Sequence, residues 1–421
     1  MNANPVGTPL IFVLASIAII LTTALSGQAA TYKVVHHFTG GADGLSPSWG
    51  AIQDSEGNLF GTTYGGGEFQ GGVVFKFSPS NDGTWSETVI YDFDFNSNIG
   101  GGPASGVTLD HTGNLFGGTV SGGPNDSGTA FELSPAGNGW AITPIYTKNG
   151  AGNMILDRAG NLFSPLGPGD NMGGAIGELS PAPGLWTYSL LHSFCQIPGC
   201  KDGILPQGPL AWDSAGNLYG NTINGGIYKY PTPCPDDEGC GLVFQMRPRP
   251  GGAWSFRILY WFGAFVGDGL LLNGGLVVDG KGNVFGSTEV GGPTGTGTVF
   301  ELSPEPQGRK GSSTLYAETQ LYTFPDCSLG CGPFGVLTRD RAGNLYGAGG
   351  GGSQSCGGYC GVVYKLSPQQ NGTWKYTLLH AFNGSDGAGP YGVTVGADGN
   401  LYGTTIAGGQ FNHGVAFEIT P

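Results

Sequence analysis

An aspartate four residues before an asparagine recurs along the chain and is the most conspicuous group that could do chemistry. Carboxylates in glycine-containing turns, as in Asp54-Ser-Glu-Gly-Asn58, are typical of calcium ligands and of acid catalysts. An active site is usually single, whereas this pattern occurs six times, so we interpret each copy as a capped turn. The six aspartates are Asp54, Asp110, Asp157, Asp213, Asp279 and Asp340.

A second set of aspartates stands before glycine in the segments that lead into the repeats. These are Asp43, Asp202, Asp268 and Asp386. Around one channel they would form an acidic rim able to hold Ca²⁺ through oxygen ligands. The alternative is that each Asp-Gly pair is an ordinary turn. No motif in the chain requires a cofactor, and Ca²⁺ is the ion that this rim would suit.

The most distinctive loop runs from Asn224 to Gly239 and combines aromatic rings with carboxylates. Rings stack on the apolar faces of sugars, and carboxylates accept hydrogen bonds from hydroxyl groups. We therefore regard the loop as a candidate ligand-binding segment for carbohydrate or peptide. Its candidate residues are Tyr228, Tyr230, Asp236, Asp237 and Glu238.

Eight cysteines occur as four close pairs, two pairs in each of two repeats. They are Cys195 and Cys200, Cys234 and Cys240, Cys327 and Cys331, and Cys356 and Cys360. An even number behind an export signal predicts disulfides, and four cysteines in one repeat allow three pairings, of which pairing of neighbours is favoured. Zinc is the alternative, but no histidine lies in these segments.

Three histidines, His36, His192 and His380, occupy a position that holds tyrosine in other repeats. This substitution pattern favours aromatic packing over catalysis. The sequence contains no Gly-x-Ser-x-Gly, no His-Glu-x-x-His and no phosphate-binding loop. We therefore assign no residue to catalysis.

The composition indicates a β protein. Of 421 residues, 83 are glycine, which disfavours a helical bundle because each interior glycine costs a helix about 1 kcal/mol relative to alanine. The hydrophobic share of 39% still suffices for a core. The formal net charge of −14 would repel phosphate backbones, so nucleic acid is not an expected partner.

The N-terminus resembles a secretory signal. An apolar run from Leu10 to Leu25 is followed by Ser26, Gly27 and Ala29, so we expect residues 1–30 to be a signal peptide. The alternative is an uncleaved N-terminal anchor. We expect a secreted monomer with no transmembrane span in the mature chain, placed outside the cell, at its surface or in the periplasm.

The tetrad Gly-Asn-(Leu/Val)-(Phe/Tyr) recurs along the chain at intervals of about 57 residues and defines one repeated unit. Its markers are Asn58, Asn114, Asn161, Asn217, Asn283, Asn344 and Asn400. Each unit predicts four antiparallel strands, so residues 31–421 are expected to form one all-β domain, a seven-bladed β-propeller.

The last copy supports ring closure. It stops after its third strand, Val415–Ile419, whereas Tyr32–Phe38 matches a fourth strand. Pairing of these segments would complete the last blade and hide two sheet edges. We therefore predict that Val34–Phe38 lies against the third strand of the last copy.

The combination Gly-Asn-Leu-Tyr-Gly-Thr-Thr, Gly-Gly and Gly-x-Val-Phe-Glu-Leu-Ser-Pro, the last as in Gly297–Pro304, resembles the GloVer tandem-repeat proteins, also called choice-of-anchor proteins. The resemblance covers roughly residues 32–421 and implies an exported repeat protein without an established activity. Members often carry a C-terminal sorting anchor, and this sequence shows none. The pattern is also similar to NHL-type and gluconolactonase-like propellers, and this similarity implies only fold.

Two functions follow as hypotheses. The first is a secreted or cell-surface, non-catalytic scaffold that binds a glycan, a protein or a cell-surface component. The alternative is a metal-dependent lactone hydrolase or lyase with its site at the mouth of the propeller channel, which needs several carboxylates or histidines to converge on one ion.

Overall fold

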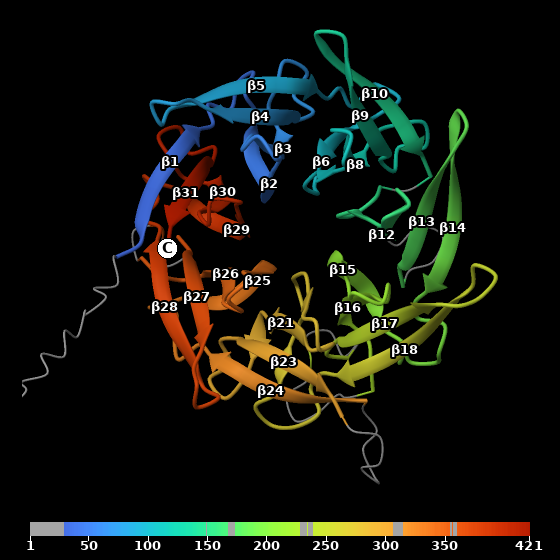
Figure 1. Ribbon diagram of the computed structural model, residues 1–421, viewed down its shortest axis with the longest axis vertical. Helices are drawn as coiled ribbons and strands as arrows, with labels where there is room; N and C mark the ends of the chain where they lie inside the picture. The colour runs from blue at the N-terminus through green and yellow to red at the C-terminus, as the bar shows by residue number, and fades with distance from the viewer. Residues whose placement is uncertain are drawn as a thin grey trace, which may run out of the picture.

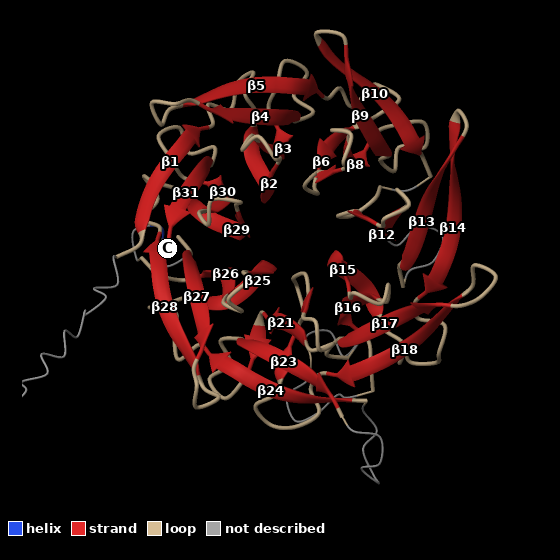
Figure 2. Cartoon of the chain, in the orientation of Figure 1, coloured by secondary structure: helices blue, strands red, loops and turns tan. Residues whose placement is uncertain are grey.

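The computed structural model describes residues 29–148, 150–166, 173–227, 234, 239–305, 315–353, 356 and 360–421. These residues form strands and connecting loops, and no α-helix occurs among them (Figure 2). It follows that no helix in this part of the chain has the length and apolar character needed to cross a membrane.

The strands form antiparallel sheets that follow the sequence repeat. In Figure 1 the sheets stand around a common centre, in a propeller-like arrangement, with the first strands innermost and the fourth strands at the periphery. The strands are β1 (Thr31–His37), β2 (Leu45–Gln53), β3 (Leu59–Gly65), β4 (Val73–Pro79), β5 (Trp85–Asp92), β6 (Gly101–Pro103), β7 (Thr108–Leu109), β8 (Leu115–Ser121), β9 (Ala130–Ala136), β10 (Gly139–Tyr146), β11 (Ile155–Leu156), β12 (Leu162–Leu166), β13 (Ala175–Ala182), β14 (Leu185–Ser193), β15 (Ile204–Trp212), β16 (Leu218–Asn224), β17 (Leu242–Pro248), β18 (Trp254–Trp261), β19 (Gly269–Leu270), β20 (Val277–Val278), β21 (Val284–Thr288), β22 (Val290–Gly291), β23 (Thr298–Pro304), β24 (Tyr316–Thr323), β25 (Cys331–Arg339), β26 (Leu345–Gly350), β27 (Val362–Pro368), β28 (Trp374–Ala381), β29 (Ala388–Val395), β30 (Leu401–Ala407) and β31 (Val415–Thr420).

The turn between the first and second strands of a repeat is closed by its aspartate. Asp54 Oδ1 accepts hydrogen bonds from the backbone N–H of Glu56 at 2.9 Å and of Asn58 at 2.8 Å, and Oδ2 accepts one from Asn58 Nδ2 at 2.7 Å. In the last repeat, where Gly396 replaces the aspartate, Asp398 accepts the hydrogen bonds of Asn400 instead. The recurrent carboxylates therefore fix turns.

The N-terminal strand lies against the last strand of the chain. Strand β1 pairs antiparallel with β31, with Val34 opposite Phe417 and His36 opposite Ala416. This is the pairing predicted from the sequence, and it makes β1 the fourth strand of a sheet that otherwise contains β29, β30 and β31 (Figure 1). A parallel bridge between Val336 and Gly392 further links β25 to β29.

The core lies between neighbouring sheets. One cluster, for example, combines Phe60, Val74 and Phe93 with Leu115 and Phe131 of the following repeat. All five side chains are buried, because second and third strands are covered by a sheet on either side. The sheets thus stand in fixed order, and their innermost strands come together at the centre.

Candidate functional site

A cavity of about 730 Å³ lies among the first four repeats. Strands β2, β8, β12 and β15 contribute to its wall, and β2 and β15 lie close to the centre of Figure 1. Its lining includes an indole ring, amide and hydroxyl groups and one ammonium group. These are Trp49, Ser105, Asn125, Asn153, Gln207 and Lys148.

Trp49 of the cavity lining packs into a row of aromatic rings from three repeats. The rings of Trp49 and Tyr391 lie 4.8 Å apart between centroids, and Tyr391 in turn contacts Phe334 at 5.6 Å. Burial, together with the negative charge of Glu289, raises the pKa of Tyr391, so its hydroxyl group stays protonated at neutral pH. We call Trp49, Tyr391 and Phe334 the aromatic arc, of which Trp49 lines the cavity.

The backbone holds Trp49 in an unusual conformation. Its φ is 59°, in the left-handed region that bulky residues rarely adopt. The pairing of β2 with β3 is irregular between Ser48 and Ile52, so Trp49 sits where the ladder is interrupted. Non-glycine residues in this region cost stability and concentrate at sites of function. This conformation supports a role for the indole in the cavity.

The rest of the lining mixes amide and hydroxyl groups with apolar side chains and is nearly free of charge. Asn153 Oδ1 accepts a hydrogen bond from Gly106 N at 3.0 Å, which fixes the amide beside Ser105 and Gln207. Among the described lining residues there is no aspartate, glutamate, histidine or cysteine, and Lys148 is the one charged group. The cavity can thus hold a ligand by stacking and hydrogen bonding, but its described lining offers no carboxylate pair or metal ligand.

Tyr228, Tyr230, Asp236, Asp237 and Glu238, the predicted ligand-binding residues, are outside the described residues.

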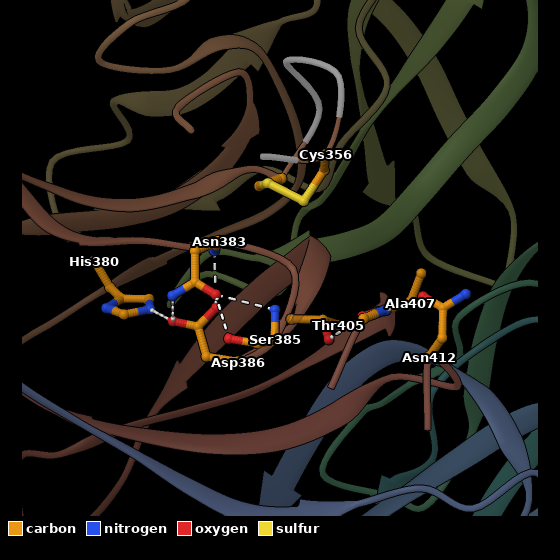
Figure 3. Close-up of a disulfide and its surroundings, with 10 residues drawn as sticks. Cys356, His380, Asn383, Ser385, Asp386, Thr405, Ala407 and Asn412 are labelled. Atoms are coloured by element: carbon orange, nitrogen blue, oxygen red, sulfur yellow. Dashed lines mark hydrogen bonds and ion pairs between the residues drawn. A yellow bond between two sulfur atoms is a disulfide. The ribbon is translucent and has the colours of Figure 1, made fainter. Parts of the chain in front are cut away.

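The four loop aspartates are not brought together in one site. Each binds its own loop, as Figure 3 shows for Asp386, which accepts hydrogen bonds from His380 Nε2 at 3.0 Å and from Asn383 N at 2.8 Å. Asp43 likewise binds His36 Nε2 at 3.0 Å and Thr39 N at 2.8 Å.

The remaining two aspartates, Asp202 and Asp268, are buried. Asp202 accepts hydrogen bonds from Gln196 N and Ile197 N. Asp268 accepts them from Ala264 N and Gly269 N, and burial still raises its pKa to about 6. Each of the four aspartates therefore caps its own loop, and ion binding by an acidic rim stays a prediction.

The cysteines are joined as neighbours. Disulfides link Cys195 to Cys200, Cys234 to Cys240, Cys327 to Cys331 and Cys356 to Cys360. The last of these lies close to the Asp386 loop in Figure 3. Each bridge closes a short segment of one connecting loop.

A second circle of contacts, which the sequence reasoning missed, runs around the periphery. Each fourth strand carries a His or Tyr at one position of its ladder, or rung. The fourth strand of the next sheet carries, at a different rung, the residue aligned with that His or Tyr. We call these two residues, one from each sheet, a junction pair. Contacts join five junction pairs: His36 and Glu87, Tyr146 and Tyr188, His192 and Phe256, Tyr322 and Tyr376, and His380 and Tyr32. Tyr91 with Ile142 and Tyr260 with Glu318 hold the equivalent rungs at the other two junctions.

Rings stack in four of these junction pairs. The closest stacks are His192 on Phe256, with centroids 3.7 Å apart, and His380 on Tyr32, at 3.8 Å. The expected aromatic packing of these two histidines is therefore confirmed. The signal that could have revealed the partners is the fixed distance from each fourth-strand tryptophan to the facing residue.

Comparison with known proteins gives a family but no activity. No functionally curated protein matches the chain. Among solved structures, a gluconolactonase from Xanthomonas campestris is 16% identical with a TM-score of 0.43, over 76% of this chain and 87% of that one. A glucose dehydrogenase is 13% identical with a TM-score of 0.44, over 93% of this chain and 99% of that one.

Identities and scores this low imply no shared chemistry. The Gloeobacter/Verrucomicrobia repeat, in contrast, matches residues 20–233 and 236–421. This match confirms the resemblance to the GloVer repeat proteins, and the chain belongs to the Gloeobacter/Verrucomicrobia repeat family.

Proposed function

We propose that this protein is an exported, closed seven-bladed β-propeller that binds a glycan in its central cavity and catalyses no reaction. Residues 31–421 form its single domain, and it acts as a monomer. The seven repeat markers, the sheets that follow them and the pairing of β1 with β31 support the closed ring.

The N-terminal segment and the disulfides both support export. Residues 1–30 have the pattern of a signal peptide, and the first strand begins at Thr31, directly behind the expected cleavage site. Four disulfides suit an oxidising compartment such as the periplasm or the cell exterior.

The observation that carries the binding function is the composition of the cavity wall. Trp49, the lining member of the aromatic arc, offers a ring face to the C–H face of a sugar, and Asn153 and Gln207 offer amides to its hydroxyl groups. A cavity of about 730 Å³ is the size that small-molecule ligands occupy. Because the described lining lacks carboxylates and histidine, binding is favoured over the metal-dependent hydrolase or lyase.

Binding to a panel of oligosaccharides tests this function. Purified protein should bind at least one of gluco-, manno-, xylo- or chito-oligosaccharides, and Trp49→Ala should weaken that binding by roughly tenfold or more, as expected for loss of a stacked ring. The matched control is Phe69→Ala, an exposed ring outside the cavity lining. Equal loss in both variants, or no binding across the panel, would contradict the proposal.

The same panel examines the predicted loop. Deletion of residues 225–239 should weaken binding only if Tyr228 to Glu238 reach the ligand. An unchanged affinity would remove this loop from the binding surface and leave the cavity as the site.

A further inference from the structure

One group of three side chains stands apart from the cavity, at the junction between the first and last sheets. His36 Nε2 on β1 lies 3.0 Å from Asp43 Oδ2 and 3.4 Å from Glu87 Oε2 on β5. The three ligand atoms all lie within 4.8 Å of one another. Among the described residues, no other group of three histidine, cysteine or acidic side chains comes this close.

The fold does not need a carboxylate at this place. Glu87 occupies the rung of a junction pair, and the same rung carries an apolar or aromatic residue in most repeats. Those residues are Ile142, Tyr188, Phe256, Tyr376 and Tyr32. Glu87 thus interrupts a circle of ring contacts, and it does so beside a histidine.

The arrangement leaves negative charge without compensation. Glu87 Oε1 is buried and has no hydrogen-bond partner, and both Glu87 and Asp43 approach a single imidazole nitrogen. A buried carboxylate is costly unless it is paired, so a cation is the group that these side chains lack.

We propose that His36, Asp43 and Glu87 bind a divalent transition-metal ion such as Zn²⁺, His36 through Nε2 and each carboxylate through one oxygen. One imidazole and two carboxylates form a donor set that such ions accept, whereas Ca²⁺ and Mg²⁺ prefer oxygen alone.

Neighbouring groups orient this donor set. Thr39 donates hydrogen bonds to Asp43 through its backbone N–H and its hydroxyl group, which holds the carboxylate toward His36. The side chains of His36, Asp43 and Glu87 remain 23%, 12% and 20% exposed, so an ion can enter from solvent and keep a bound water. The ion would tie β1 to β5.

The chain contains its own control. Tyr260 and Glu318 hold the same two rungs at another junction, where the Tyr260 hydroxyl lies 3.3 Å from Asp268 Oδ2, but tyrosine stands where the site has histidine. Glu318→Gln therefore removes a carboxylate from the same rung without touching the proposed ligands.

Titration of metal-free protein with ZnCl₂ tests the proposal, read by calorimetry and by thermal unfolding. We expect one Zn²⁺ per chain and a melting temperature that rises with Zn²⁺ concentration, with no comparable response to CaCl₂ or MgCl₂. His36→Ala and Glu87→Gln should abolish the response, and Glu318→Gln should retain it. Thr39→Val should weaken Zn²⁺ binding by roughly 10- to 100-fold, as loss of an outer-shell hydrogen bond does.

Glu87→Tyr tests the Zn²⁺ site even if the other variants do not fold. Tyrosine occupies this rung at three other junctions, so this variant should fold and still lose the Zn²⁺ response. The inference is overturned if the wild-type protein shows no Zn²⁺ response, or if Glu87→Tyr binds Zn²⁺ as tightly as the wild type.

Discussion

A single glycine in each repeat decides how closely two strands can pack. Gly61 on β3 lies opposite Phe75 on β4, and a Cβ atom added to it would come within 2.4 Å of the Phe75 ring. In the third repeat the pair is exchanged, since Ser164 stands opposite Gly177. The serine side chain fits there because the ring is absent, which explains the departure of this repeat from the sequence pattern.

We expect Gly61→Ala to destabilise the protein by about 1–3 kcal/mol, the usual cost of overpacking a closed core. Phe75 is fully buried and has no free space into which its ring can move. Urea unfolding followed by tryptophan fluorescence measures the change. Gly280→Ala, where an added Cβ meets no atom within 4 Å, is the matched control and should change stability little.

The pH dependence of the free energy of unfolding should reflect the ionisation of Glu318. Burial, with the charge of Asp268, raises its pKa from 4.5 to about 8. Between these pH values the folded chain keeps a proton that the unfolded chain releases, so stability falls as pH rises. Glu318→Gln should flatten this slope and stabilise the protein at pH 8 by about 4 kcal/mol.

Unfolding by urea between pH 5 and 8.5 measures this slope. Exposed Glu68→Gln serves as the control and should leave it unchanged. A slope in Glu318→Gln equal to that of the wild type would show that another group dominates the titration.

Among the elements, the connecting loops carry the disulfides, and each bridge spans few residues. Cys327 and Cys331 are separated by four positions, and no bridge has a separation above six. Short loops lose little chain entropy on closure, so each bridge adds modestly to stability.

Replacement of both Cys327 and Cys331 by serine should lower the free energy of unfolding by about 2 kcal/mol and leave the protein folded. The urea midpoint measures the loss, and circular dichroism verifies the β structure. Complete unfolding of this variant would mean that the bridge fixes more than its own loop.

At the scale of the whole molecule, the pairing of β1 with β31 joins the two ends of the chain. Lys33 lies opposite Glu418, so the double variant Lys33→Cys with Glu418→Cys should form a new disulfide on oxidation. Peptide mapping by mass spectrometry detects the link. Lys33→Cys with Glu301→Cys, which pairs β1 with a strand of another sheet, should form none.

Much of this architecture could be predicted from the sequence, and most of the site could not. The sheets were predicted from the repeat markers Asn58 to Asn400. The pairing of the chain ends was predicted from Tyr32–Phe38, a strand pattern that belongs to no complete repeat. Both predictions succeeded because they rest on patterns within strands. Trp49, Tyr391 and Gln207 belong to three different repeats. Their convergence depends on how innermost strands turn toward the centre, which residue spacing does not reveal.

The position of Thr31 opposite Thr420 has a consequence for biogenesis. The segment that would cross a translocon first acquires its partner only after the final residues have emerged. Until then both edges are open to pairing with other chains, and such distant contacts form slowly. Shielding of this early strand until the last residues are made would therefore raise the yield of native protein, and a truncation that removes β31 would leave the edge of β1 open.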